Sequence, residues 1–230
     1  MKPEATVGIL MLDSRFPRLP GDVGNPATWP FPVRYGIVRG ATPDRVVMRQ
    51  DPDLLGPFID AGRELVRDGA TGITTTCGFL SMFQDELAVA LSVPVATSSL
   101  MQVEMVNRVL PAGQRAGILT ICASTLTAEL LAKANVPDDT PIGTTEGGRE
   151  FTRAILENRF ELDVNLARRD NVAAARSLAA AHPDLGAIVL ECTNMGPFAA
   201  DIAADTGLPV YSIVSFLNWF QSGLAPPAFG

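Results

Sequence analysis

Residues 71–80 read TGITTTCGFL, and this stretch joins a buried strand to the start of a helix. Its first part, Thr71–Thr76, is uncharged and rich in β-branched residues, which is typical of a buried strand. A helical pattern follows over Phe79–Leu91, so Cys77 and Gly78 lie in the turn between the two elements. A strand that leads directly into a helix predicts an α/β protein, in which reactive groups lie at such turns.

The same alternation continues along the whole chain and predicts parallel sheets with helices on both faces. Strands are expected at Thr6–Leu12, Val33–Val38, Thr71–Thr76, Val93–Thr97, Ala116–Ile121, Thr140–Thr144, Gly186–Leu190 and Leu208–Ile213. Helices are expected over Asp53–Arg67, Phe79–Leu91, Leu100–Leu110, Thr125–Ala134, Arg149–Asn158, Asn171–Ala181, Phe198–Asp205 and Phe216–Gln221.

Two pairs of segments indicate an internal duplication, with chance similarity between buried strands as the alternative. VGILMLDS at 7–14 resembles AGILTICAS at 116–124, and TGITTTCGFL at 71–80 resembles GAIVLECTNM at 186–195. We therefore expect two pseudo-symmetric, doubly wound α/β domains, each with a parallel four-stranded sheet and with the active-site cleft between them. The N-terminal domain is expected to comprise residues 1–98 and 212–230, with the last helix returning to it, and the second domain residues 99–211.

Composition excludes several classes of function. The chain has 230 residues, a formal charge of −7 and no run of basic residues, which argues against nucleic acid or an anionic membrane as a partner. The sequence has no signal peptide or membrane-spanning segment, so we expect a cytoplasmic protein with three reduced cysteines. Its single histidine leaves little for a metal site, and the residues demand no metal and no cofactor.

Cys77 and Cys192 both follow a predicted strand and precede a predicted helix. The N-terminus of a helix carries partial positive charge and free N–H groups, which stabilise a thiolate and can bind a carboxylate. If the two halves are duplicates, these turns face each other across one cleft. A substrate there has one sulfur on each side, which suits removal of a proton from one face of a carbon and its return to the other.

These turns resemble those of the Asp/Glu/hydantoin racemase superfamily. LDS at 12–14 is similar to the Asp-Ser turn of glutamate racemases, TTTCGF at 74–79 to the first cysteine turn, and LECTNMGPF at 190–198 to the second. GNPAT at 24–28 is similar to the Gly-Pro-Ala-Thr loop of aspartate racemases, and ILTICAST at 118–125 to the opening strand of the second domain. The resemblance implies a cofactor-independent enzyme, commonly a dimer, with a small anionic substrate.

The resemblance also implies a set of site residues. Cys77 and Cys192 exchange the roles of acid and base. Substrate binding is assigned to Asp13, Ser14, Asn25, Thr76, Gly78, Thr120, Thr193 and Asn194. For most of these a structural role in a turn, a cap or a strand is the competing interpretation.

Three departures from the family pattern affect the expected substrate. Arg15 replaces the glycine that follows Asp-Ser, Asn194 stands where glutamate racemases carry histidine, and Glu191 replaces the glycine before the second cysteine. The two cysteines are retained, so these three departures concern which substrate is bound and leave the proton-transfer pair in place. Cys122 also follows a predicted strand, but we expect a semi-buried, nonessential thiol. In the proline-rich loop, Trp29 and Phe31 are expected to form a wall of the pocket, with packing under the loop as the alternative.

The first hypothesis for function is a racemase or epimerase of a small carboxylate-bearing amino acid or related compound, which uses both thiols. The second is a cis–trans isomerase or lyase of a small dicarboxylate on the same scaffold, in which one cysteine is a covalent nucleophile, as in maleate isomerases. The third is a small-ligand-binding protein without catalytic activity, because a fold alone does not determine function.

Overall fold

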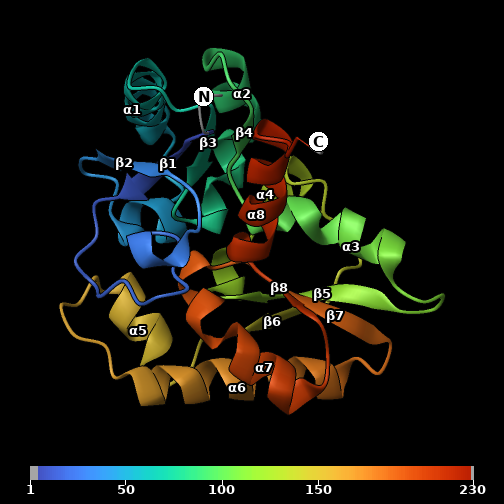
Figure 1. Cartoon of the computed structure of the whole chain (residues 1–230). Helices are drawn as coiled ribbons and strands as arrows, with labels where there is room; N and C mark the ends of the chain where they lie inside the picture. The colour runs from blue at the N-terminus through green and yellow to red at the C-terminus, as the bar shows by residue number, and fades with distance from the viewer. Residues whose placement is uncertain (1–4, 229–230) are drawn as a thin grey trace.

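The computed structural model describes residues 5–228 and contains two parallel four-stranded sheets. The first sheet has the strand order β2-β1-β3-β4 and the second β6-β5-β7-β8, so both halves share one topology (Figure 1). The strands are β1 (Val7–Leu12), β2 (Val33–Val38), β3 (Gly72–Thr75), β4 (Val95–Ala96), β5 (Arg115–Thr120), β6 (Ile142–Thr144), β7 (Leu185–Leu190) and β8 (Val210–Tyr211). The predicted α/β class with two similar parallel sheets is confirmed.

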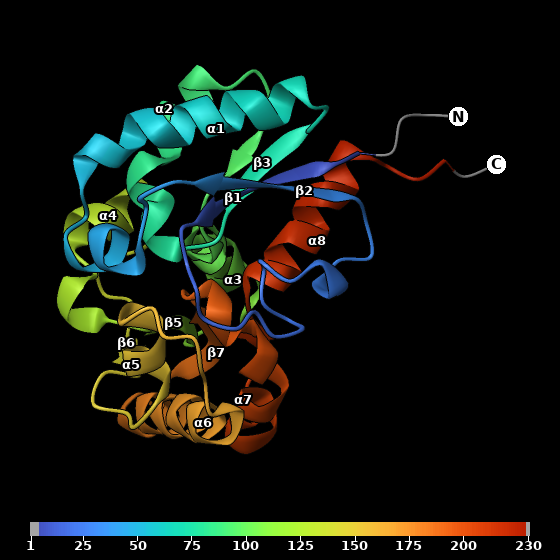
Figure 2. The ribbon, with the colours of Figure 1, turned by 90° about the vertical axis from the view of Figure 1, so that its left-hand side faces the viewer.

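Helices cover both sheets. The α-helices are α1 (Leu55–Arg67), α2 (Gln84–Ala90), α3 (Val103–Val109), α4 (Ala128–Lys133), α5 (Phe151–Leu156), α6 (Val164–Ala181), α7 (Ala199–Thr206) and α8 (Ile213–Leu224). Shorter helical turns are η1 (Pro26–Thr28), η2 (Asp44–Met48), η3 (Pro52–Leu54), η4 (Gly78–Phe83), η5 (Ser99–Gln102), η6 (Ala123–Thr125) and η7 (Thr193–Phe198). Figure 2 shows α1 and α2 on the outer side of the first sheet, and α6 and α7 on the outer side of the second.

The first sheet buries apolar side chains on both faces, which explains the uninterrupted apolar run of β1. Leu10 and Leu12 lie in a core that continues into the second sheet, where it includes Leu119 and Leu190. Val7 and Ile9 belong to a separate cluster on the opposite face. Hydrogen bonds join the segments at the carboxyl ends of β1 and β3, of β5 and β7, and of β3 and β7, so these ends lie close together between the two halves.

Helix α8 lies against the N-terminal sheet although it is the last helix of the described chain. Its Ile213, Phe216 and Leu217 pack with Val7 and Ile9. The segment enters α8 through a capping box at Ser212, which also accepts a hydrogen bond at its main-chain oxygen from Gln102 Nε2 (3.0 Å).

Several element boundaries differ from those predicted by pattern. Helix α6 begins at Val164, not Asn171, because Asp163 caps its N-terminus by accepting hydrogen bonds from the N–H groups of residues 165 and 166. The π-helical turn η2 was not predicted from the sequence. Strands β4 and β8 have only two residues each, and each follows a proline that cannot donate to a strand ladder.

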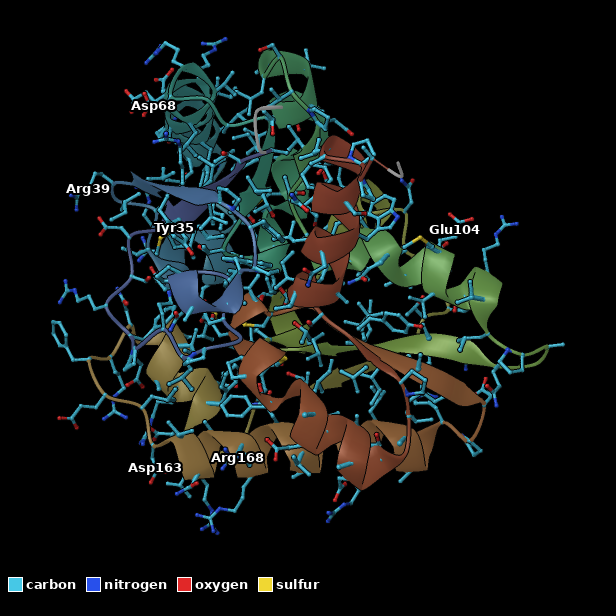
Figure 3. All side chains as sticks on the ribbon, viewed as in Figure 1. Tyr35, Arg39, Asp68, Glu104, Asp163 and Arg168 are labelled. Carbon is cyan, nitrogen blue, oxygen red and sulfur yellow. The ribbon has the colours of Figure 1, made fainter. Side chains whose placement is uncertain are left out.

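Charged side chains lie mainly on the outside of the molecule, as Figure 3 shows for Arg39, Asp68 and Glu104. Among residues 5–228, no helix has both the length and the apolar character that crossing a membrane requires.

Candidate active site

The two cysteine turns have the same local structure. Cys77 follows β3 and is the N-cap residue of η4, and Cys192 follows β7 and is the N-cap residue of η7. Both side chains are buried, with 8% and 7% of their residue surface exposed. Both cysteines line one cavity between the two sheets. The structure therefore brings the two thiols to a single site, as the sequence predicts.

The cavity is small and mostly apolar. Its volume is about 20 Å³, roughly the space of one water molecule. Its lining residues come from both halves of the chain: Leu12, Phe16, Pro43, Val47, Thr76, Cys77, Ile121, Ile155, Leu156, Glu191, Cys192 and Asn194. This volume is smaller than a small organic acid.

One contact between the halves lies beside this cavity, next to the lining residue Leu156. The side chain of Asn158 accepts a hydrogen bond from the Arg15 N–H (2.6 Å) and donates one to the Asp13 carbonyl (3.4 Å). Asn158 has a φ of 55°, a left-handed conformation that asparagine tolerates better than most residues. The contact holds the segment after β1 against the end of α5.

A second link joins the cysteine turns directly. Thr193 Oγ1 donates a hydrogen bond to the main-chain oxygen of Thr76 (2.7 Å). The hydroxyl oxygen of Thr76 accepts one from the Leu12 N–H (3.0 Å). The two threonines that flank the thiols thus fix the position of one turn relative to the other.

Both thiols are strongly disfavoured as thiolates in the closed site. Burial raises the pKa of Cys77 well above its usual range, and the Glu191 carboxylate raises it further. The N–H groups of Phe79 and Leu80 and the Arg18 guanidinium lower the pKa of Cys77. Burial also raises the pKa of Cys192, and the negative charges of Glu191 and Cys77 raise it further.

Glu191 lies immediately before Cys192 and is fully buried. Its Oε2 accepts a hydrogen bond from Thr120 Oγ1 (2.8 Å), while Oε1 has no partner. Burial raises the pKa of Glu191 to about 7, although the Thr120 hydroxyl acts in the opposite direction. Thr120 therefore acts on the site through Glu191 and does not itself line the cavity.

Asn194 connects the cavity to the proline-rich loop. Its Oδ1 accepts a weak hydrogen bond from the Cys192 thiol (3.5 Å), and its Nδ2 donates to the Asp22 carboxylate. Asp22 is itself paired with Arg18 (3.1 Å), whose other terminal nitrogen donates to Ser14 Oγ (2.8 Å). The loop after β1 thereby positions the amide of Asn194.

Some predicted binding residues lie away from the cavity lining. Asp13 accepts a hydrogen bond from the Gly40 N–H (3.0 Å) and closes a turn beside β2. Ser14 contacts Arg18, and Asn25 caps η1 and donates to the Arg18 carbonyl (2.7 Å). Ser14 and Asn25 thus hold the loop that carries Arg18, and none of the three residues lines the thiol cavity.

Two further expectations concern aromatic residues and the third thiol. The expectation that Trp29 and Phe31 form a wall of the thiol cavity is wrong. Trp29 donates through Nε1 to the Val23 carbonyl (3.0 Å), and both rings pack in the cluster under α8. Cys122 is buried, lies outside the cavity lining, and its thiol donates to Glu146 Oε1 (3.3 Å).

Sequence reasoning missed several residues of the site. Phe16, Val47 and Ile155 line the cavity, but apolar residues in loops and short helices carry no signal of that role. Arg18 and Asp22 have the i,i+4 spacing of an ion pair, yet the proline-rich loop gave no reason to place them beside a thiol. Within residues 5–228, no cluster of three His, Cys, Asp or Glu side chains has the arrangement of a metal site.

Comparison with known proteins gives the family. No protein-family model matches the chain. It is 31% identical over 234 residues to a dimethylsulfoniopropionate lyase from Durusdinium sp. clade D. The alignment covers 98% of this chain and 77% of that protein. The chain belongs to the same family as this lyase. Further relatives of the same name come from Emiliania huxleyi.

Solved structures of the superfamily share the fold. Allantoin racemase from Klebsiella pneumoniae superimposes with a TM-score of 0.68 at 17% identity, over 96% of this chain and 87% of that one. A cysteine variant of arylmalonate decarboxylase in its sulfate-associated form gives 0.66 at 18% identity, over 97% and 94%. The named relatives in the superfamily are enzymes, and the relatives at higher sequence identity favour the lyase hypothesis over the racemase hypothesis.

Proposed function

We propose that this chain is a lyase that cleaves dimethylsulfoniopropionate. The observation that carries the proposal is the 31% identity to a lyase of that name over 98% of the chain. The buried pair of thiols in one cavity supports it, because a base is the one group that such a cleavage demands.

The reaction is a β-elimination. A cysteine thiolate takes a proton from the carbon next to the substrate carboxylate, and the electron pair of that C–H bond forms the carbon–carbon double bond. The C–S bond breaks, and its electron pair stays on sulfur. The products are acrylate, neutral dimethyl sulfide and a cysteine thiol. The leaving group departs uncharged, so it needs no proton from an acid.

The residues around the thiols fit this chemistry. Thr76 Oγ1 accepts from the Leu12 N–H, and within the described residues its own hydrogen has no acceptor, so it is free to bind the substrate carboxylate. Asn194 is fixed by Asp22 and presents its Oδ1 towards Cys192, which orients that thiol. The apolar remainder of the lining excludes water from the base.

The test is to supply purified protein with dimethylsulfoniopropionate and measure dimethyl sulfide in the headspace and acrylate in solution. Cys77→Ser and Cys192→Ser identify the base. Loss of a general base is expected to lower kcat about 10²–10⁴-fold. Cys122→Ser is the matched control, because that thiol is buried but lies outside the cavity. Absence of both products from the folded wild type would refute the proposal.

A racemase is the second candidate, favoured by the presence of two thiols in the lining where an elimination needs one base. It predicts solvent exchange at the α-carbon of single enantiomers of amino acids or hydantoins in deuterated water, without formation of an alkene. Proton NMR of the same samples separates the two candidates.

A further inference from the structure

The carboxyl group of Glu191 is a fully buried acid in the lining of the thiol cavity. One oxygen, Oε2, accepts a hydrogen bond from Thr120, and the other, Oε1, has no partner. An unpartnered carboxylate oxygen in an apolar environment is strongly destabilising unless a ligand offsets its charge. The mechanism above assigns Glu191 no part, so this group needs its own explanation.

No basic side chain offsets this charge within the described residues, because none of their ion pairs includes Glu191. The nearby basic group is Arg18, which is paired with Asp22 and bonded to Ser14. The titratable neighbours in the cavity, Cys77 and Cys192, are acids and add no positive charge. The cavity therefore has an excess of acidic groups on the side where Glu191 lies.

Gly78 packs directly against this carboxyl group, where a larger residue would not fit. A Cβ atom at Gly78 would lie 2.4 Å from Glu191 Oε1 and 2.5 Å from the main-chain oxygen of Glu191. Glycine at position 78 therefore lets the cysteine turn of the first half pass directly over the carboxyl group from the second half. Both halves contribute to the slot that holds Oε1.

We propose that Glu191 is the counter-ion of a positively charged group on the substrate, which selects a zwitterion with a cation such as a sulfonium two carbons from its carboxylate. This inference rests on the proposed function. A sulfonium carries its charge without N–H donors, so one carboxylate oxygen is enough to bind it. The bound cation also lies beside both thiols and favours the thiolate, so the substrate helps to ionise its own base.

Two ligands of the same shape isolate the charge. The first is 3-(trimethylammonio)propanoate, and the second is 4,4-dimethylpentanoate, in which carbon replaces the charged nitrogen. Their dissociation constants are measured by calorimetry at pH 8 for the wild type, Glu191→Gln and the control Glu146→Gln, whose carboxyl bonds Ser124 outside the cavity. The preference for the cation is expected to fall roughly 30-fold or more in Glu191→Gln and to persist in Glu146→Gln.

A measurement on the wild type alone keeps the inference testable if Glu191→Gln does not fold. Binding of 3-(trimethylammonio)propanoate at pH 6.5 is expected to release protons, because the Glu191 carboxyl must ionise to pair with the cation, whereas 4,4-dimethylpentanoate, which has no cation, releases none. Calorimetry in two buffers of different ionisation enthalpy measures this release. Equal proton release for both ligands, or an unchanged cation preference in Glu191→Gln, would overturn the inference.

The outcomes separate this inference from the proposed function. Release of dimethyl sulfide by a wild type with no cation preference refutes the role of Glu191 and leaves the lyase in place. A clear cation preference that Glu191→Gln removes, in a protein that releases no dimethyl sulfide, supports the counter-ion and refutes the lyase.

Discussion

Thr193 and Thr76 are joined across the two halves of the molecule: the hydroxyl of Thr193 donates to the main-chain oxygen of Thr76 at 2.7 Å. Each threonine is next to a cysteine in the sequence, so this one bond sets the spacing between the thiol turns. Fixed spacing matters because a base misplaced by about 1 Å lowers a proton-transfer rate substantially.

Thr193→Val removes this bond while keeping the shape of the side chain. It is expected to destabilise the protein by about 1–3 kcal/mol, because the Thr76 carbonyl loses a buried donor, and to lower kcat about tenfold or more. Thr193→Ser retains the hydroxyl and serves as the control. Denaturant unfolding and initial rates measure the two effects, and equal values for Val and Ser would contradict this role.

Gly78→Ala tests the slot that holds the Glu191 carboxyl. The new Cβ would meet two oxygens of Glu191 at 2.4 and 2.5 Å, so the turn must move. We expect a loss of about 1–3 kcal/mol in stability and a large drop in activity, since Cys77 moves with the turn. The matched control is Gly223→Ala in α8, where the added Cβ has no atom within 4 Å apart from its chain neighbours and its own helix backbone. That change is expected to be neutral or to stabilise by up to about 1 kcal/mol.

The raised pKa of Glu191 predicts how stability depends on pH. Its value of about 7 exceeds the ordinary 4.5, so between these values the folded state binds more protons than the unfolded state. The free energy of unfolding therefore falls as pH rises from about 4.5 to 7, by roughly 3 kcal/mol from this group.

Glu191→Gln removes this dependence, and its stability relative to the wild type is expected to increase between pH 5 and pH 8. The neighbouring thiols of Cys77 and Cys192 have raised pKa values and stay protonated in the folded state over this range. Urea unfolding at several pH values provides the measurement. The same stability difference at pH 5 and pH 8 would show that Glu191 does not titrate as described.

The thiol pKa values predict an alkaline activity profile. Because both are raised, the thiolate fraction in the free enzyme grows with pH, so kcat/KM is expected to rise about tenfold per pH unit between pH 7 and 8.5. Initial rates across this range measure how log kcat/KM changes with pH. A rate of dimethyl sulfide release that does not depend on pH would contradict the prediction. A free thiol of ordinary pKa would instead level off near pH 8.5.

The sequence was sufficient for the fold and for the two thiols. Apolar runs such as Val7–Leu12 and Leu185–Leu190 carry a clear strand signal because parallel strands are buried on both faces. The similar strand–Cys–helix segments located Cys77 and Cys192, and the structure places them in one cavity. These features depend on local pattern and on a repeated topology, which a sequence expresses directly.

The remaining part of the site depends on long-range packing. Glu191 is recognisable from the sequence as a departure from the family pattern, but its unpartnered oxygen follows from its contacts with Gly78 and Thr120. Asp13 was expected near the substrate, yet it bonds Gly40, because the turn after β2 lies beside it. Trp29 was assigned to the pocket by its loop, whereas its ring packs under α8, some 190 residues later in the sequence.

The tight closure of the thiol cavity sets a physical limit on turnover. For the proposed substrate of eight heavy atoms, we expect turnover to separate Asn158 from Asp13 and Arg15, because the cavity has a volume of only about 20 Å³. We therefore expect the turnover rate to be limited by how often the two halves of the chain open and close. Raising the viscosity of the solvent with sucrose is then expected to lower kcat, because opening of the site depends on viscosity and the bond-breaking step does not.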